Sequence, residues 1–442
     1  MKRYRTVQYI LYTALLSVIA NSFCLVARER MALICLVPLL VFICLFAGTV
    51  FPKVQSMRIR FCRHGAVLLN VWVFSLPPAI IYHIVLAVKT LPDDHQTLLW
   101  SILYCVVAEA IVFWLGILCV YCTSLQLGLK TRVLGVICGL VPIANLLALF
   151  VILHTLRDEI DTEYQKEQRN LARKSRQVCK TKYPLLLVHG VFFRDYKHFH
   201  YWGRIPAELK ANGACIFVGD HESAHPVAQS AAELAERIKT IVRETGCEKV
   251  NIIAHSKGGL DCRYALSELG VAPYVASLTT VNTPHRGCLF ADHYLGIVSD
   301  ELKQNVSRVY NAAMRALGDQ SPDFLAAVGD LTHRACEERN QLLKDPEGVF
   351  CQSIGSVVNR SASGKFPLNV TSALIKPYDG VNDGLVGENS FAWGESYRLI
   401  KSDGNRGVSH ADMIDLFREN HPEFDVREYF VELVHELKEK GF

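Results

Sequence analysis

The sequence has little net charge and lacks the long basic segments that are typical of proteins that bind nucleic acids. Its 442 residues carry 47 Lys and Arg against 43 Asp and Glu, which leaves a formal charge of +4. Nucleic-acid binding depends on a basic face that neutralises phosphates, and neither such a face nor an RNA-binding signature is present. We therefore expect no nucleic-acid partner.

Metal-ligand spacing and a disulfide framework are also missing, although the chain has 15 cysteines. Eight of them lie in the first 156 residues, which are apolar, and there Cys serves as a small hydrophobic side chain. The other seven cannot all form pairs, because their number is odd. Their segment is also long enough to build a core without disulfides. Cys119 and Cys122 have the spacing of a redox pair, but they stand inside an apolar run, so we favour helix packing for them.

Internal repeats are absent, but composition divides the chain sharply. Residues 1–156 contain five apolar runs, and a bilayer core takes a helix of about 20 such residues. No small-residue cleavage site follows the first run, so we expect that run to be retained. We therefore predict a transmembrane α-helical domain over residues 1–156 and an integral membrane protein. The runs are 7–27, 31–51, 65–88, 97–125 and 133–155.

The distribution of Lys and Arg predicts the side of the membrane on which each end lies. The N-terminus and the second and fourth loops are basic, whereas the third loop carries Asp93 and Asp94. The positive-inside rule then places the N-terminus in the cytoplasm and, after five spans, the rest of the chain outside, at the plasma membrane. Arg28, Arg30 and the basic residues of 169–182 favour the opposite orientation.

One acidic residue, Glu109, lies inside the fourth apolar run. An ionisable side chain at membrane depth is a candidate functional group. No second charged residue stands near it in the run, so we favour a hydrogen bond between helices over an ion path.

From residue 183 to 442 the chain alternates between strand and helix patterns, after a charged helical linker predicted at 157–182. Such alternation predicts an α/β fold with a doubly wound, mostly parallel sheet. Ligands bind such sheets beyond the carboxyl ends of the strands, so we expect the chemistry there. The predicted strands are 184–188, 214–218, 249–254 and 277–281, and 228–245 has helical spacing.

A nucleophile elbow is predicted where the third of these strands ends. Ser256 stands between the strand and a helix, with Ala254 two residues before it and Gly258 two residues after it. Small residues allow the tight turn that exposes the Ser hydroxyl and aims the helix dipole at a developing oxyanion. The alternative is that Ser256 only caps the helix.

An acid and a histidine follow Ser256 in the chain order of α/β-hydrolases. Asp383 lies in a turn with the sequence Asn-Asp-Gly-Leu-Val, and His410 lies in a polar loop before the last helix. His410 would take the Ser256 proton and return it to the leaving group, while Asp383 would fix the tautomer of His410. The alternatives are Asp379 for the acid and His421, His293 or His255 for the base.

The oxyanion donors are predicted from the turns that follow the first and third strands. We assign them to the backbone amides of Val191, after the His-Gly pair, and Lys257, at the start of the elbow helix.

Taken together, these motifs resemble the true bacterial lipases of the Pseudomonas and Burkholderia type. The resemblance implies an α/β-hydrolase fold and hydrolysis of triacylglycerols or other carboxylic esters through an acyl-enzyme. It matches Ser256, Asp383 and His410 to the family's triad and Val191 and Lys257 to its oxyanion residues. The similar stretches are 184–191, 201–209, 249–259, 283–287 and 382–387.

Two departures separate the chain from that family, which holds a calcium ion with two Asp carboxylates. Asp412 matches one of these, but residues 355–375, which should supply the other, contain no acid. One carboxylate makes a weak calcium site, so we expect no cofactor. The family's disulfide partner is also absent, because Glu388 and Asn389 follow the Asn-Asp-Gly motif.

A mostly helical insertion at about 288–350 stands where such lipases carry a lid over the site. Aromatic residues after the first strand would join it to form an apolar acyl cleft, although some of them would simply be core. These aromatics are Phe192, Phe193, Tyr196, Phe199, Tyr201 and Trp202.

The sequence therefore predicts a membrane-anchored lipase or esterase that acts on a lipid ester. One alternative is a phospholipase or acyltransferase with the same triad. Another, of a different class, is a membrane sensor whose hydrolase domain binds lipid without catalysis.

Overall fold

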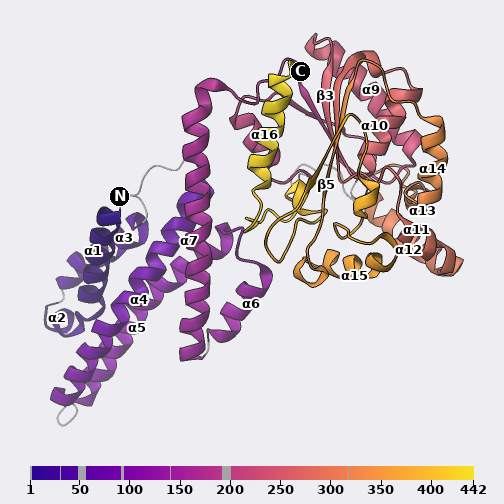
Figure 1. The fold of residues 1–442 in the computed structure, drawn as a ribbon. Helices are drawn as coiled ribbons and strands as arrows, with labels where there is room; N and C mark the ends of the chain where they lie inside the picture. The colour runs from indigo at the N-terminus through magenta and orange to yellow at the C-terminus, as the bar shows by residue number, and fades with distance from the viewer. Residues whose placement is uncertain are drawn as a thin grey trace. The chain divides into compact units, whose positions relative to one another are not determined.

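The computed structural model describes residues 2–29, 31–47, 56–90, 94–139, 141–191, 201–316 and 318–442. It divides into two compact units, Met1–Arg169 and Asn170–Phe442 (Figure 1). The segment expected as a linker is continuous with the last apolar run, because a single helix, α7, covers Pro142–Arg173.

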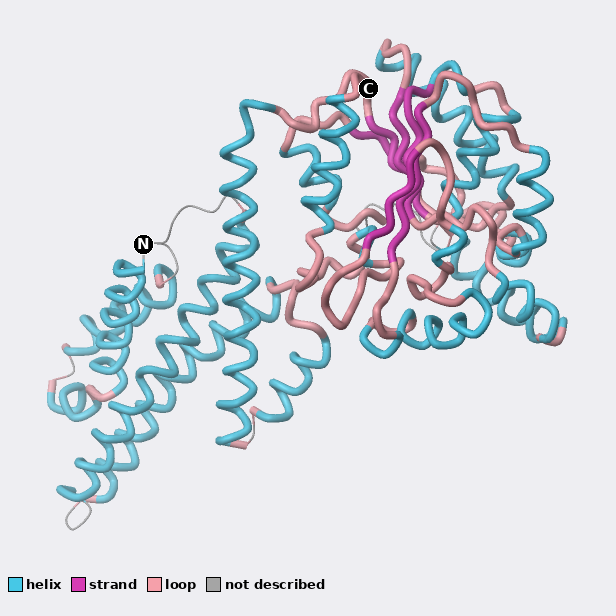
Figure 2. Tube along the Cα trace, viewed as in Figure 1, coloured by secondary structure: helices cyan, strands magenta, loops and turns pink. Residues whose placement is uncertain are grey.

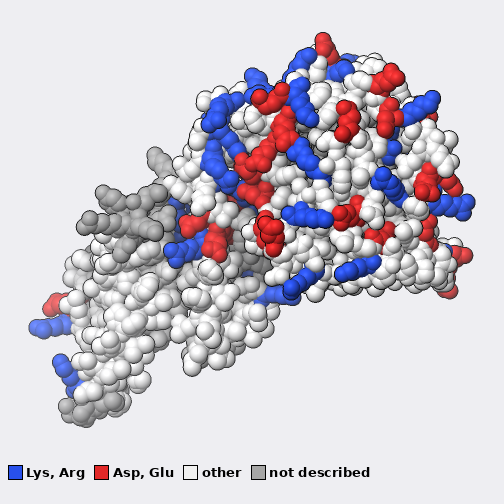
Figure 3. Space-filling model, viewed as in Figure 1, with Lys and Arg blue, Asp and Glu red and all other residues white. Residues whose placement is uncertain are grey.

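The described part of the N-terminal unit is helical, and its visible face carries few charged side chains (Figure 3). Helices α4 and α5 pack closely because Gly65 and Gly116 leave no side chain between them. A Cβ at Gly65 would lie 2.7 Å from the Gly116 carbonyl oxygen. The helices are α1 (Lys2–Ala20), α2 (Phe23–Arg28), α3 (Ala32–Phe46), α4 (Met57–Thr90), α5 (His95–Thr123), α6 (Leu129–Cys138) and α7.

Two helices of the described residues, α4 and α5, are long and apolar enough to cross a membrane, by length and composition. The other expected runs are shorter or interrupted. The first run is divided after Ala20, where the side chains of Asn21 and Ser22 bond to the backbone carbonyls of Ser17 and Ile19. The second run forms the 15-residue α3, and the fifth is divided between α6 and α7.

The C-terminal unit is built on a parallel sheet, which has six strands in the described residues (Figure 2). This sheet confirms the doubly wound fold. Strands β5 and β6 were not predicted from the sequence, because Cys, Gln, Ser, Tyr and Arg interrupt their apolar residues. In spatial order the strands are β2 (Ile216–Val218), β1 (Leu185–Val188), β3 (Val250–His255), β4 (Val275–Val281), β5 (Phe350–Ser356) and β6 (Ser396–Ile400).

Helices cover both faces of the sheet (Figure 1). Alternate residues of β1 point to opposite faces: Leu185 and Leu187 pack against α8 and α16, whereas Leu186 and Val188 pack against α9 and α10. The bounds are α8 (Ile205–Ala211), α9 (Val227–Thr245), α10 (Lys257–Glu268) and α16 (Val426–Glu439).

Between β4 and β6 the chain adds further helices at the carboxyl side of the sheet. The first four lie in the insertion predicted at 288–350, and whether they act as a lid stays a prediction. They are α11 (Leu289–Ile297), α12 (Asp300–Ala316), α13 (Phe324–Gly329) and α14 (His333–Leu342), and α15 (Leu368–Asp379) follows β5. All 15 cysteines, each in a described segment, are free thiols.

The strand order changes direction at β1, which lies between β2 and β3. The loops that leave β1 and β3 at their carboxyl ends therefore lie at the switch point of the strand order, which is where doubly wound sheets bind ligands.

Two histidines buried near this edge must stay neutral. Arg263 donates a hydrogen bond to Nδ1 of His285 at 3.2 Å, so the ring proton sits on Nε2 and faces Thr280 Oγ1 at 2.9 Å. Burial, and then the Arg263 charge, hold the pKa of His285 well below its usual value of 6.5. Burial does the same for the pKa of His255.

Stability should therefore fall as pH drops below about 6.5, because the unfolded chain binds protons that the folded chain excludes. Each histidine removes about 1.4 kcal/mol of unfolding free energy per pH unit. Urea unfolding between pH 7 and 5 measures this slope, and His285→Gln should reduce it by one histidine's share. An unchanged slope in that variant would contradict a neutral, buried His285.

Candidate active site

Ser256 occupies the sharp turn between β3 and α10. Its backbone has φ 55° and ψ −132°, a strained conformation that L-residues rarely adopt. Such strain is found most often at functional sites. The side chain makes no capping hydrogen bond although the residue occupies the N-cap position. The helix-cap alternative for Ser256 therefore does not describe this turn.

Two glycines allow this turn to lie against its neighbours. A Cβ at Gly258 would lie 2.3 Å from the His189 carbonyl oxygen, and one at Gly259 would lie 2.1 Å from Thr283 Oγ1. A side chain at Gly258 would therefore displace the backbone, and one at Gly259 would displace the Thr283 side chain. Thr283 in turn donates a hydrogen bond to the Ser256 carbonyl at 2.8 Å, which fixes the elbow to the loop after β4.

Asp383 is fully buried and every lone pair of its carboxylate is directed at a donor. Oδ1 accepts from the backbone amides of Leu385 and Val386, each at 2.8 Å, as the tight turn folds back on the side chain. Oδ2 accepts from Asn282 Nδ2 at 2.6 Å and lies 2.6 Å from His410 Nδ1. These four contacts fix the orientation of the carboxylate.

His410 is held against Asp383 at two points. Its Nδ1 lies 2.6 Å from the carboxylate, and its backbone N–H donates to the Asp383 carbonyl at 2.8 Å. Because a carboxylate can only accept, Nδ1 carries a proton and Nε2 of the neutral ring is left as a base. The His410 ring lies 4.4 Å from the ring of His255, the residue before Ser256. The structure thus brings Asp383 and His410 together beside the elbow.

The alternative residues are engaged elsewhere. Asp379 accepts hydrogen bonds from the Leu289 and Phe290 amides and so caps α11. His421 bonds to the Gly407 carbonyl at 2.8 Å, and His293 packs on Tyr378. His255 Nδ1 bonds to the Tyr201 hydroxyl at 2.7 Å.

The predicted oxyanion amides flank the elbow. Lys257 is the first residue of α10, so its N–H has no acceptor within the helix. Gly190 lies against Ser256, because a Cβ on it would come 2.8 Å from Ser256 Cβ. Val191 follows directly and is buried. Both turns predicted to supply the amides therefore border Ser256.

The expected acyl-cleft aromatics divide into two groups. Phe192, Phe193, Tyr196 and Phe199 lie outside the described residues. Tyr201 and Trp202 are buried in the core instead, where Trp202 packs against Phe430 and the Tyr201 hydroxyl bonds to His255.

Two residues that the sequence analysis missed support the site. Asn282, at the end of β4, donates from Nδ2 to Asp383 and also to Ser356 Oγ at 2.7 Å. Its φ of 48° is one that Asn tolerates better than most residues. Thr283 anchors the elbow. The only signal for Asn282 was its position directly after a predicted strand, whereas Thr283 begins the stretch 283–287 that resembles the bacterial lipases.

The side chain of Lys257 points away from the oxyanion amide into a buried polar cluster. Its ammonium donates to Asp261 Oδ1 at 2.8 Å and Ser230 Oγ at 2.9 Å, and His221 Nε2 lies 3.8 Å from Asp261. Burial raises the pKa of Asp261 to about 7 despite the opposing ammonium. The cluster therefore anchors the first turn of α10 at a high electrostatic cost.

A calcium ion does not fit the residues around Asp412. One of its carboxylate oxygens accepts from Arg406 at 2.7 Å, and the other accepts from the amide and hydroxyl of Ser409. The Arg406 guanidinium already neutralises this carboxylate. Within the described segments there is no group of three or more His, Cys, Asp or Glu that could hold a metal.

Comparison with known proteins places this site in a wider context. A family model described as alpha/beta hydrolase fold matches residues 183–366. A triacylglycerol lipase of Pseudarthrobacter phenanthrenivorans is 34% identical over 165 residues, which cover 34% of this chain and 51% of that protein. A triacylglycerol lipase of Vibrio cholerae is 29% identical over 276 residues, which cover 54% and 87%.

Among solved structures, the chain is similar to the mature form of Bacillus licheniformis lipase BlEst2. The match has a TM-score of 0.44 and 21% identity, covering 57% of this chain and 92% of that one. The chain spans about half the length of the Pseudarthrobacter relative.

Removing the Asn282 amide should slow turnover without weakening substrate binding, because Asn282 positions Asp383. We expect Asn282→Gly, which keeps the positive φ free of strain, to lower kcat about tenfold or more, from the loss of a charged hydrogen bond. Steady-state kinetics on a soluble ester measures this, with Asn305→Ala on exposed α12 as the control. A change in KM alone would argue against the positioning role.

Breaking the Lys257–Asp261 pair should destabilise the C-terminal unit without touching the Lys257 amide. We expect Lys257→Met to lower the free energy of unfolding by about 3 kcal/mol, because Asp261 is left buried without its partner. Lys257→Met with Asp261→Leu should recover most of the loss, and Lys239→Met, which breaks only an exposed pair with Glu236, should cost less than about 1 kcal/mol. Denaturant unfolding tests this, and a double variant no better than the single one would refute it.

Proposed function

We propose that this chain, of which residues 183–366 match the model of the alpha/beta hydrolase fold, is a serine hydrolase that cleaves the carboxylic esters of lipids. The observation that carries the proposal is the buried hydrogen bond between Asp383 and His410, 2.6 Å long, beside the strained Ser256 turn. A purely structural ion pair would not need an elbow of this kind next to it.

The chemistry follows from these groups. Ser256 Oγ attacks the ester carbonyl carbon while its proton passes to His410 Nε2, and the Asp383 carboxylate stabilises the resulting imidazolium. The amides of Val191 and Lys257 receive the negative charge on the carbonyl oxygen. Collapse breaks the bond to the alcohol, which leaves with the proton from His410. Water then repeats the sequence on the acyl-Ser256 and releases the acid.

Lipid esters are the proposed substrates. The relatives of Pseudarthrobacter and Vibrio are named triacylglycerol lipases, and α4 and α5 are long and apolar enough to enter a bilayer. A hydrolase fused to a membrane-embedded unit meets substrates that reside in the membrane. That the protein is an integral membrane protein is part of the proposal, and a plasma-membrane site with the hydrolase unit outside the cytoplasm stays a prediction.

Replacing Ser256 should abolish covalent labelling and turnover together, because the nucleophile is lost. We expect Ser256→Ala to prevent modification by a fluorophosphonate probe and to lower hydrolysis of p-nitrophenyl esters by about a thousandfold or more. Ser175→Ala, at an exposed position of the same unit, should behave as wild type.

The outcomes separate the alternatives. Equal labelling of wild type and Ser256→Ala would contradict the proposal. Labelling of Ser256 without turnover of any ester would support a lipid-binding sensor. Faster acyl transfer to added alcohols or use of phospholipids would instead support an acyltransferase or a phospholipase with the same triad.

A further inference from the structure

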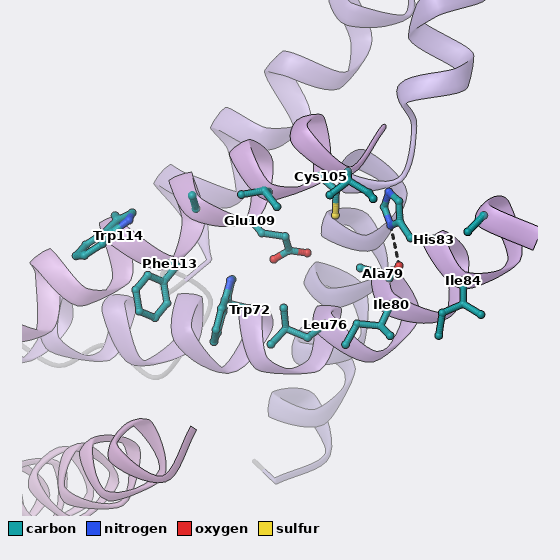
Figure 4. Close-up of a pocket in the computed structure, with 14 residues that line it drawn as sticks. Trp72, Leu76, Ala79, Ile80, His83, Ile84, Cys105, Glu109, Phe113 and Trp114 are labelled. Carbon is teal, nitrogen blue, oxygen red and sulfur yellow. Dashed lines mark hydrogen bonds between the residues drawn. The ribbon is translucent and has the colours of Figure 1, made fainter. Parts of the chain in front are cut away.

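A groove runs between α4 and α5 within the N-terminal unit (Figure 4). Its volume is about 590 Å³, within the range of pockets that hold small molecules. Most of its wall is aliphatic or aromatic, including Trp72, Ile80 and Phe113. Such a wall suits a long hydrocarbon chain.

One acidic side chain interrupts this apolar wall. Glu109 is only 5% exposed and its carboxylate points into the groove (Figure 4). Oε2 accepts a hydrogen bond from Ser75 Oγ at 2.8 Å, whereas Oε1 has no hydrogen-bond partner among the described residues. A buried carboxylate oxygen without a donor is costly. The site therefore lacks one hydrogen-bond donor.

The neighbouring histidine does not supply that donor. His83 Nδ1 donates to the Ala79 carbonyl at 2.9 Å, and Nε2 lies 3.1 Å from Ser101 Oγ. Both ring nitrogens are thus occupied within the helix pair. The expected hydrogen bond of Glu109 between helices exists, through Ser75, but it satisfies only half of the carboxylate.

A second polar group faces the same part of the groove. Trp72 presents the nitrogen-bearing edge of its indole toward Glu109 (Figure 4). The groove therefore offers one acceptor and one donor to an incoming group. A hydroxyl donates and accepts at once, whereas an ammonium only donates and an ester oxygen only accepts.

We propose that this groove is a binding site for a long-chain lipid with a free hydroxyl group. The hydroxyl donates to Glu109 Oε1 and accepts from the Trp72 indole N–H, and the hydrocarbon chain lies along the apolar wall. Binding here does not require catalysis at Ser256, so this site is independent of the proposed hydrolase activity.

Photo-crosslinking of the full chain in lipid nanodiscs tests the site. The probe is a hexadecanol that carries a diazirine and an alkyne, and its methyl ether, which cannot donate, is the matched control probe. We expect the alcohol to label peptides of α4 and α5 about tenfold more than the ether, with octadecanol as an effective competitor.

Variants assign the labelling to the groove. Glu109→Leu replaces the carboxylate with an apolar group of similar size and should reduce labelling about tenfold, with Glu109→Gln between it and wild type. Ala110→Phe fills the groove and should abolish labelling even if Glu109→Leu misfolds. Val107→Phe adds the same ring at an exposed α5 position outside the groove and should label as wild type.

Three results would overturn the proposal: equal labelling by alcohol and ether, wild-type labelling of Glu109→Leu, or stronger competition by hexadecylamine than by octadecanol. Fluorophosphonate labelling of Ser256 in the same samples reports separately on the hydrolase site. A failure of the groove therefore leaves the proposed activity standing, and the reverse also holds.

Discussion

The turn after β1 and the first turn of α10 lie so close together that no side chain fits between them, and the active-site geometry depends on this contact. Gly258 meets the His189 carbonyl, and Gly190 meets the side chain of Ser256. Ser256 has its strained conformation at this contact, and both turns that are predicted to supply the oxyanion amides border it. Parallel pairing of β1 with β3 makes such an approach possible, because both strands end at the same edge of the sheet.

The buried charges of the site are each satisfied by several partners. Asp383 accepts from two backbone amides and one side-chain amide besides His410, so its orientation is set by three separate segments. Lys257 and Asp261 form an ion pair within α10, and Lys257 also bonds to Ser230 of α9. Such pairs add little net stability, but they fix one arrangement, because removal of either partner leaves a buried charge alone. Rigid positioning of this kind is what electrostatic catalysis requires.

Much of the hydrolase unit could be predicted from sequence because its central strands are continuous apolar runs. β1, β3 and β4 were found in this way, as was the buried face of α9. β5 and β6 were missed because polar residues interrupt their pattern. Ser256 was recognisable because small residues flank it directly after a predicted strand. Asn282 was not, since its role depends on a contact with Asp383, 101 residues away.

The N-terminal unit was harder to predict, because hydropathy reports composition and not where a helix ends. Asn21 and Ser22 end α1 through bonds to the preceding turn, and Pro142 starts a new helix inside an expected span. Hydropathy also could not show that one carboxylate oxygen of Glu109 has no hydrogen-bond donor among the described residues. That property depends on the packing of α4 on α5.

The central claim is that Ser256 forms an ester with the acyl group of its substrate. Mass spectrometry after rapid acid quench of a slowly hydrolysed p-nitrophenyl ester tests it most directly. The account predicts an acyl adduct on the tryptic peptide Val250–Lys257, which contains Ser256, formed at the rate of the nitrophenol burst. Steady ester hydrolysis without that adduct, or an adduct on another peptide, would contradict it.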